Sequence, residues 1–211
     1  MNNTFESLPE EKRKLIIDVS MEEFARNGYE KASTNVIVKK AGISKGILFH
    51  YFGNKKNLFL YIIDYAMDVF LEKFYSMDEQ VPSDLFDKII HWGLKKLKLY
   101  YELPLVSKLI MKAYINIPDE LKEEMSVRYR KIYNENLPLF LNDIDTTKFR
   151  EGVDKEKAVE LIMLCLEGLN GKYIQKFRSD PEAGIPQMDE IFNQMKEYFE
   201  ILKGGLYGSP Q

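Results

Sequence analysis

The sequence predicts an all-α fold of about nine helices, and three observations lead to that expectation. Apolar residues recur every three or four positions along most of the 211 residues, as they do on the buried face of an amphipathic helix. No window shows sustained alternation of apolar and polar residues between turn residues, so no sheet is expected. Prolines separate the later helical segments, at Pro82, Pro104, Pro118, Pro138, Pro181 and Pro186.

The first helix is expected to begin near Pro9. The segment Ser7-Leu8-Pro9-Glu10 has the Ser-x-x-Glu form of a capping box and places a proline in the first turn. Apolar residues at helical spacing continue from there to Gly28, where the helix should stop.

Two short helical patterns follow, and Gly42 separates them. Thr34 is placed to cap the first by accepting a backbone N–H hydrogen bond, and Ser44 is placed to cap the second. In the second pattern Leu48 and Phe52 are four residues apart and can face inward, which leaves an unusually aromatic exposed face. Two short helices joined in this way form a helix-turn-helix, whose second helix lies in the major groove of DNA.

The charge distribution favours the same interpretation. The whole chain has 33 acidic and 30 basic residues, whereas the window from Lys31 to Ile63 contains six lysines and no aspartate or glutamate. A basic window in an acidic protein suits binding to phosphates, because neutralised phosphates release counterions.

The rest of the chain is expected to form one helical domain, residues 55–211, behind a helix-turn-helix DNA-binding domain of residues 1–54. A helix that begins near Lys55 continues to about Phe74 and would join the two domains. Later helices are expected at 84–101, 104–115, 118–141, 154–177 and 186–202, with a polar connection at 143–153.

The combined pattern up to Leu58 resembles the N-terminal domain of TetR-type transcriptional regulators. The matching positions are Phe24, Gly28, Tyr29, Ser33, Thr34, Ile37, Ala41, Gly42, Ile43, Ser44, Gly46, Phe52, Lys55 and Leu58. The resemblance implies phosphate contacts by Thr34, Lys45, Tyr51 and Lys55, and contacts to base edges by Gly46, Ile47 and His50. The predicted DNA-binding set is Thr34, Ser44, Lys45, Gly46, Ile47, Phe49, His50, Tyr51, Asn54 and Lys55.

Several of these positions depart from the family pattern or allow another interpretation. Phe49 stands where relatives often carry tyrosine, so its ring is expected to contact sugar or a thymine methyl group. Val38 stands where a small alanine is usual, and its extra methyl groups could change the angle between the two helices. His50 fits equally well a histidine bonded to a neighbouring carbonyl, and Asn54 could simply cap the next helix.

The last two helices carry long apolar stripes. In TetR-like proteins the two C-terminal helices pair with their symmetry mates in a four-helix bundle, which implies a homodimer that binds a palindromic site. The alternative is that both stripes only close the core of the monomer. The predicted dimer interface is Leu161, Cys165, Leu169, Ile191, Met195, Tyr198, Phe199 and Leu202.

The middle helices are rich in aromatic residues and methionine. Each of these residues alone is explained by a packed core, but as a group they resemble the lining of a cavity for a small, mainly apolar effector. The predicted ligand-binding residues are Phe70, Phe74, Trp92, Tyr100, Met111, Tyr114, Tyr129, Met163, Glu167 and Asn170.

Signals of catalysis are nearly absent. The two histidines lie far apart with no metal-ligand spacing around them, and the sequence has no Gly-rich phosphate loop or nucleophile elbow. We therefore expect no enzyme activity, no cofactor and no metal site. The single cysteine, Cys165, excludes an internal disulfide. Together with the lack of an apolar signal segment or membrane-length apolar run, it predicts a cytoplasmic protein.

The sequence thus predicts a ligand-responsive, homodimeric transcriptional regulator of the TetR type, with repression as its expected effect. Its expected partners are double-stranded operator DNA, a second copy of the chain and a small effector, with no membrane. The effector would change the separation of the two DNA-binding domains through the helix that begins near Lys55. Two alternatives stay open: a helical protein-interaction module and, with less support, an enzyme that uses the helical pocket.

Overall fold

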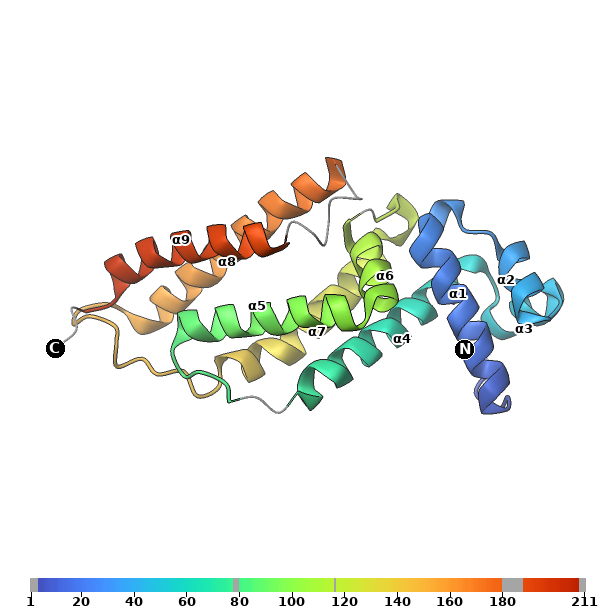
Figure 1. The fold of residues 1–211 in the computed structure, drawn as a ribbon, viewed down its shortest axis with the longest axis horizontal. Coiled ribbons are helices and arrows are strands. Elements are labelled where there is room, and N and C mark those ends of the chain that lie inside the picture. The colour runs from blue at the N-terminus through green and yellow to red at the C-terminus, as the bar shows by residue number, and fades with distance from the viewer. Residues whose placement is uncertain (1–3, 78–79, 116, 180–187, 209–211) are drawn as a thin grey trace. The chain divides into compact units, whose positions relative to one another are not determined.

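The computed structural model describes residues 4–77, 80–115, 117–179 and 188–208, and most of them are helical (Figure 1). The helices are α1 Glu10–Lys31, α2 Thr34–Ala41, α3 Lys45–Phe52, α4 Lys55–Ser76, α5 Leu85–Glu102, α6 Pro104–Ile115, the 3₁₀ turn η1 Asp119–Leu121, α7 Lys122–Leu141, α8 Lys155–Ser179 and α9 Met188–Leu206. In the described part of the chain, extended pairing is limited to an isolated antiparallel bridge between Phe149 and Tyr207. The all-α prediction is confirmed.

The helix α1 begins at Glu10, next to the predicted start at Pro9, but its N-terminus is not closed by the predicted capping box. Pro9 occupies the N-cap position with no side-chain hydrogen bond, and the Ser7 hydroxyl instead donates to the Thr4 carbonyl at 2.9 Å. The predicted capping box is therefore wrong, because the serine forms a local bond before the helix begins. Gly28 leaves helical geometry with φ 69° and ψ 175°, so the regular helix is interrupted at the predicted position, and after this kink a short helical segment extends to Lys31.

The described residues form two compact units. The first comprises residues 1–77 and 99–130, and the second comprises residues 78–98 and 131–211. The division passes through α5 and α7, and the sequence-based boundary between residues 54 and 55 stays a prediction.

The first unit has its core around α1, which packs against α2, α4 and α6. Its largest fully buried side chains are each less than 2% exposed. They are Phe5, Ile16, Phe24, Ile37, Leu48, Leu58, Ile62, Ile63 and Leu99. Buried residues of α2 and α3 belong to this set, so the helix-turn-helix is attached to a packed core.

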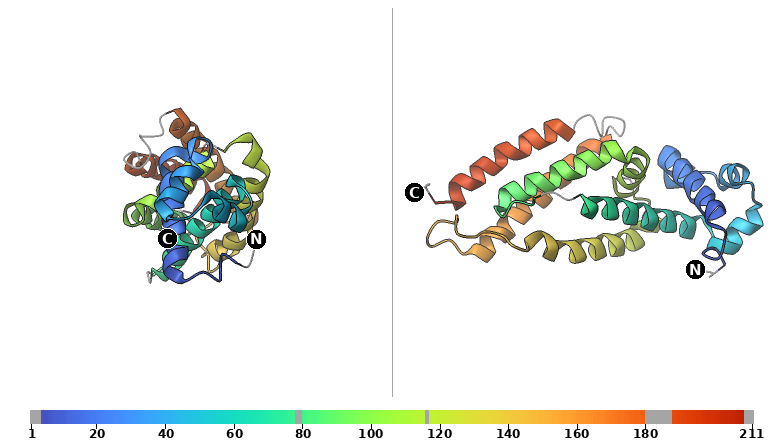
Figure 2. Two further views of the ribbon diagram at one scale, coloured as in Figure 1. Left: turned by 90° about the vertical axis from the view of Figure 1, so that its right-hand side faces the viewer. Right: turned by 60° about the horizontal axis from the view of Figure 1, so that its bottom comes forward.

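In the second unit α8 and α9 lie side by side in each view (Figures 1 and 2). Its core consists of Leu85, Phe86, Ile89, Phe140, Phe149, Ala158, Ile162 and Phe199. At Gly93 of α5 the ring of Phe192 comes so close that a Cβ atom would lie 2.2 Å from Cε1. Glycine therefore allows this close approach of α9 to α5.

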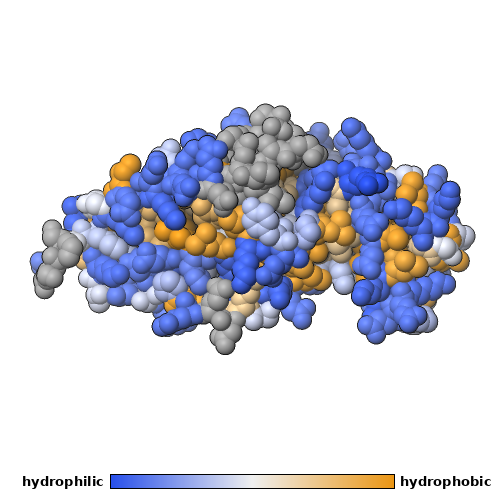
Figure 3. All heavy atoms as spheres, viewed as in Figure 1, coloured by the Kyte–Doolittle hydropathy of each residue, from blue (hydrophilic) through white to orange (hydrophobic). Residues whose placement is uncertain are grey.

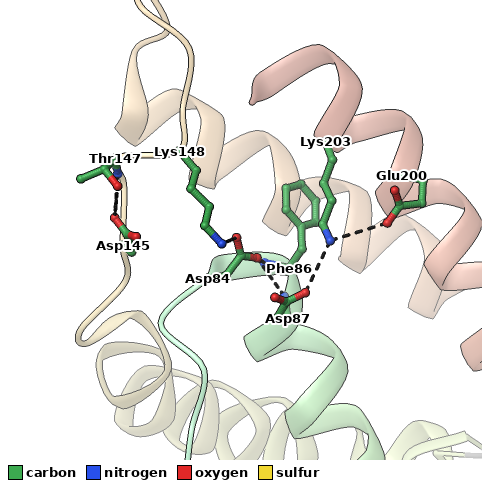
Figure 4. A network of polar contacts seen from close by, with 8 residues as sticks. All are labelled: Asp84, Phe86, Asp87, Asp145, Thr147, Lys148, Glu200 and Lys203. Carbon is green, nitrogen blue, oxygen red and sulfur yellow. Dashed lines mark hydrogen bonds and ion pairs between the residues drawn. The ribbon is translucent and has the colours of Figure 1, made fainter. Parts of the chain in front are cut away.

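Polar contacts tie the start of α5 to the connection before α8 and to α9 (Figure 4). Asp84 accepts hydrogen bonds from the backbone N–H groups of Phe86 and Asp87 at 3.0 and 3.1 Å, and from Lys148 Nζ at 2.9 Å. Burial alone would raise the pKa of Asp84, but these hydrogen bonds outweigh burial and hold the pKa below its usual value. Lys203 of α9 reaches Asp87 at 3.4 Å.

Candidate nucleic-acid interface

The turn between α2 and α3 has the geometry of a helix-turn-helix. Gly42 ends α2 in the left-handed conformation, with φ 63° and ψ 34°, which glycine adopts without steric penalty. Ser44 then caps α3, because its Oγ atom accepts a hydrogen bond from the Ile47 N–H at 3.2 Å. The predicted Ser44 cap is confirmed, and the serine hydroxyl proton can still be donated to another group.

The third helix divides into an inner and an outer face. Leu48 and Phe52 are 0% and 3% exposed, which confirms that they anchor the helix. The outer face contains four exposed predicted DNA-binding residues, namely Lys45, Gly46, Ile47 and His50. Phe49 and Tyr51 are half-buried, and Lys45 Nζ lies 5.8 Å from the centre of the Phe49 ring.

Thr34 does not cap α2. The N-cap position belongs to Ser33, and no side-chain hydrogen bond closes this helix end. The Ser33 N–H instead donates to Glu23 Oε1 at 2.9 Å, and the Asn27 amide donates to the same oxygen at 2.9 Å. Glu23 is 6% exposed, so a buried carboxylate of α1 holds the entrance to α2. No local sequence pattern predicts this role of Glu23, because its partner Ser33 lies ten residues away.

The segment before α1 also packs against the helix-turn-helix, which the sequence did not predict. Phe5 is fully buried, and its ring packs against Phe52 at 4.7 Å and against Tyr51 and Tyr61 at 5.5 Å between centroids. The Tyr61 hydroxyl donates to Glu6 Oε1 at 3.0 Å. Burial is the main cause that raises the pKa of Tyr61 to about 12, and this hydrogen bond is the second.

His50 and Tyr51 also line a cavity of about 520 Å³. Asp64 and Arg128 also line this cavity, and they form a bidentate ion pair with N–O distances of 2.6 and 2.8 Å. The remaining lining residues are Phe52, Gly53, Asn57, Leu60 and Tyr61.

The start of α4 brings two predicted residues together. Asn54 caps the helix, since its Oδ1 atom accepts from the Asn57 N–H at 2.8 Å, and the proposed capping role is confirmed. Lys55 donates to the Glu30 carbonyl at 3.0 Å and lies 5.0 Å from the centre of the Tyr29 ring. An ammonium has three N–H donors, so this single hydrogen bond is compatible with a phosphate contact.

The predicted ligand-binding residues fall into both units. Phe70 and Tyr100 pack together in the first unit with ring centroids 6.0 Å apart, and that unit also contains Phe74, Met111, Tyr114 and Tyr129. The second unit contains Trp92, Met163, Glu167 and Asn170. The side chain of Asn170 lies outside the described part of the chain.

The residues predicted to form the dimer interface differ in how exposed their side chains are. Leu161 and Tyr198 are 46% and 41% exposed, whereas Ile191 and Phe199 are 6% and 1% exposed. Phe199 packs on Phe86 within the core of the second unit, at 5.5 Å between centroids. Ile191 and Phe199 therefore offer almost no exposed apolar surface in this chain, and their place in a dimer interface stays a prediction. The other four, Cys165, Leu169, Met195 and Leu202, are half-buried.

The described residues contain neither a metal-ligand cluster nor a membrane-spanning helix. No group of three or more His, Cys, Asp or Glu side chains there could hold a metal ion. No helix there combines the length and the apolar character that a membrane-spanning segment requires.

Protein families match both parts of the chain. Residues 16–62 match the bacterial regulatory proteins of the tetR family, and residues 83–207 match the tetracyclin repressor-like C-terminal domain. An HTH-type transcriptional regulator of Staphylococcus aureus (strain USA300) is 27% identical over 143 residues, which are 66% of this chain and 74% of the relative. The fatty acid metabolism regulator protein of Bacillus subtilis (strain 168) is 26% identical over 160 residues, 70% of this chain and 75% of the relative.

Solved structures of similar fold cover nearly the whole chain. A TetR family transcriptional regulator from Chloroflexus aurantiacus J-10-FL has a TM-score of 0.57 and 22% identity, with 99% of each chain covered. The fatty acid degradation regulator FadR from Bacillus halodurans has a TM-score of 0.57 and 20% identity, with 92% of this chain and 98% of that chain covered.

Proposed function

Since the chain belongs to the TetR family of bacterial regulatory proteins, we propose that it represses transcription as a homodimer bound to a palindromic operator. The observation that carries this proposal is the outer face of α3. Leu48 and Phe52 anchor the helix, and Ser44 caps it, so Lys45 and His50 are presented to solvent on a fixed backbone. Such a helix can enter the major groove.

Gly46 supports contact with base edges. A Cβ atom at this position would approach only Ser44 Oγ, at 3.8 Å, among atoms within 4 Å. Packing within the described chain therefore does not require glycine there. A missing side chain on the outer face would allow the backbone to come close to DNA.

The test is a titration with duplex DNA at several salt concentrations. Phosphate contacts make the logarithm of the affinity fall linearly with the logarithm of the salt concentration. Lys45→Ala and Lys55→Ala should each flatten this slope by about one unit. Lys131→Ala is the control, because Lys131 is an exposed lysine of the second unit paired with Glu135. Unchanged slopes for Lys45→Ala and Lys55→Ala would refute the proposed phosphate contacts.

The proposed dimer rests on α8 and α9. These helices carry four exposed apolar side chains, Leu161, Leu164, Tyr198 and Ile201, with exposures of 46%, 58%, 41% and 74%. In the space-filling view hydrophobic residues come to the surface in the region of α5 and α9 (Figure 3). Apolar surface of this kind is typical of an interface. Two copies held about 34–36 Å apart would fit successive major grooves.

The proposed effector is a small, mainly apolar molecule. The aromatic and methionine-rich residues of α4 to α8 support it. Two relatives are named as regulators of fatty acid metabolism and of fatty acid degradation, so we propose a molecule with an acyl chain. An effector that favours the DNA-incompetent arrangement by ~3 kcal/mol would lower operator affinity on the order of a hundredfold. Palmitate added to the DNA complex should release the duplex, and an unchanged affinity would contradict an acyl effector.

A further inference from the structure

Lys56, one of the six lysines of the basic window, contacts acidic residues from a distant part of the sequence. Its Nζ atom forms an ion pair with the Glu124 carboxylate of α7 and donates to the Glu120 carbonyl of η1 at 2.9 Å. The window from residue 31 to residue 63 has no acidic residue of its own. The charge that neutralises Lys56 is therefore supplied by the segment that begins α7, and all these residues belong to the first unit.

Neighbouring contacts hold Glu124 in this position. Arg128, one turn later, donates to the Glu124 carbonyl at 3.2 Å while it pairs with Asp64 of α4. The hydrogen bond from Lys56 lowers the pKa of Glu124, so this carboxylate stays ionised near neutral pH. Glu124 is thus a negative charge held in place beside Lys56.

A second set of contacts links the same segment to α1. The pKa of Tyr29 is raised to about 12, mainly by burial and secondly by a hydrogen bond to Glu120. The ring of Tyr29 also carries Lys55 Nζ at 5.0 Å. Glu120 therefore contacts Lys56 through its carbonyl and Tyr29 through its carboxylate, and the Tyr29 ring in turn lies against Lys55.

We propose that Lys56 is a phosphate-binding residue and that Glu124 competes with DNA for it. An ammonium group paired with a carboxylate neutralises no phosphate, so the pair must open when Lys56 contacts the DNA backbone. The side chains of Lys56 and Glu124 are 31% and 33% exposed, and ion pairs this close to solvent are weak enough to exchange. Glu124 thereby lowers both the affinity for DNA and the number of phosphates neutralised. This inference rests on the proposed DNA-binding function.

The test compares Glu124→Gln with Glu123→Gln. Both variants remove one negative charge at neighbouring positions of α7, but Glu123 is exposed and Glu124 contacts Lys56. Binding to a mixed-sequence duplex is measured by fluorescence anisotropy over a series of salt concentrations. Glu124→Gln should bind about fivefold more tightly than Glu123→Gln at low salt. Its salt slope should be steeper by about 0.9, the value for one additional phosphate.

Removal of Lys56 separates a specific competition from a general effect of charge. In a Lys56→Ala background Glu124→Gln should give no gain over Glu123→Gln, and a persistent gain would overturn the proposal. Weaker binding by Glu124→Gln than by Glu123→Gln would also overturn it, because the pair would then position the helix-turn-helix for DNA. Equal binding of the two variants, when the wild-type chain binds DNA, would remove this inference alone. Absence of salt-dependent binding by the wild-type chain would remove the proposed function as well.

Discussion

Replacing Glu23 with alanine tests how the helix-turn-helix is attached to α1. The Glu23 carboxylate is 6% exposed, and one oxygen accepts hydrogen bonds from Ser33 and Asn27, each at 2.9 Å. A hydrogen bond to a charged group contributes about 1.5–3 kcal/mol, and the lower value suits these partly buried donors. The two bonds together predict a loss of about 3 kcal/mol. For a chain of this length that loss lowers Tm by roughly 6–12 °C.

Glu22→Ala is the matched control, because it makes the same substitution at the neighbouring position of α1. The Glu22 side chain is 55% exposed and pairs with Lys40 at 3.1 Å, so its loss should cost no more than about 1 kcal/mol. Urea and thermal unfolding measure stability, and duplex titration measures binding. Glu23→Ala should also weaken DNA binding, since Ser33 begins α2. If the two variants unfold within about 0.5 kcal/mol of each other, Glu23 does not anchor the motif.

Three further predictions concern packing, pH and assembly. Gly93→Ala should destabilise the chain by about 1 kcal/mol, because its Cβ would lie 2.2 Å from Phe192. In a Phe192→Ala background it should instead stabilise by roughly the same amount in urea unfolding. Tyr29 and Tyr61 have pKa values of about 12, whereas unfolded tyrosines ionise near pH 10. Stability should therefore be fully present below about pH 10 and fall as the pH rises towards 12, and a flat profile in urea unfolding would contradict this. Ile201 is 74% exposed, so Ile201→Asp should leave the fold intact but shift light scattering towards a monomer; an unchanged dimer would exclude this face.

The sequence was sufficient for features that depend on near neighbours. Helical periodicity predicted the helices, and Leu48 and Phe52 were correctly placed on the inner face of α3 because they are one turn apart. Ser44 and Asn54 were correctly assigned as caps, since each accepts an N–H hydrogen bond three residues later. Such bonds can be inferred from a few consecutive residues.

Features that depend on distant residues were not predictable in the same way. Phe5 and Tyr61 meet across 56 positions of sequence, and the pairing of Asp64 with Arg128 spans 64 positions. No local pattern marks these partners. Helical periodicity also gives the direction of an apolar stripe but not its width. For that reason Phe199 was predicted to face a partner, although the structure buries it in the core.

The structure also changes how the basic window should be understood. By sequence it holds six lysines and no acid, but the fold brings Glu22 to Lys40 and Glu124 to Lys56. A lysine that already has a carboxylate partner must lose it before it can neutralise a phosphate, so it adds less to the salt slope. Lys55 instead contacts a carbonyl oxygen, which carries no net charge. Lys55→Ala should therefore flatten the slope by about one unit and Lys40→Ala by clearly less. Equal effects of these two substitutions would show that the carboxylates contacting the window do not reduce its effective charge.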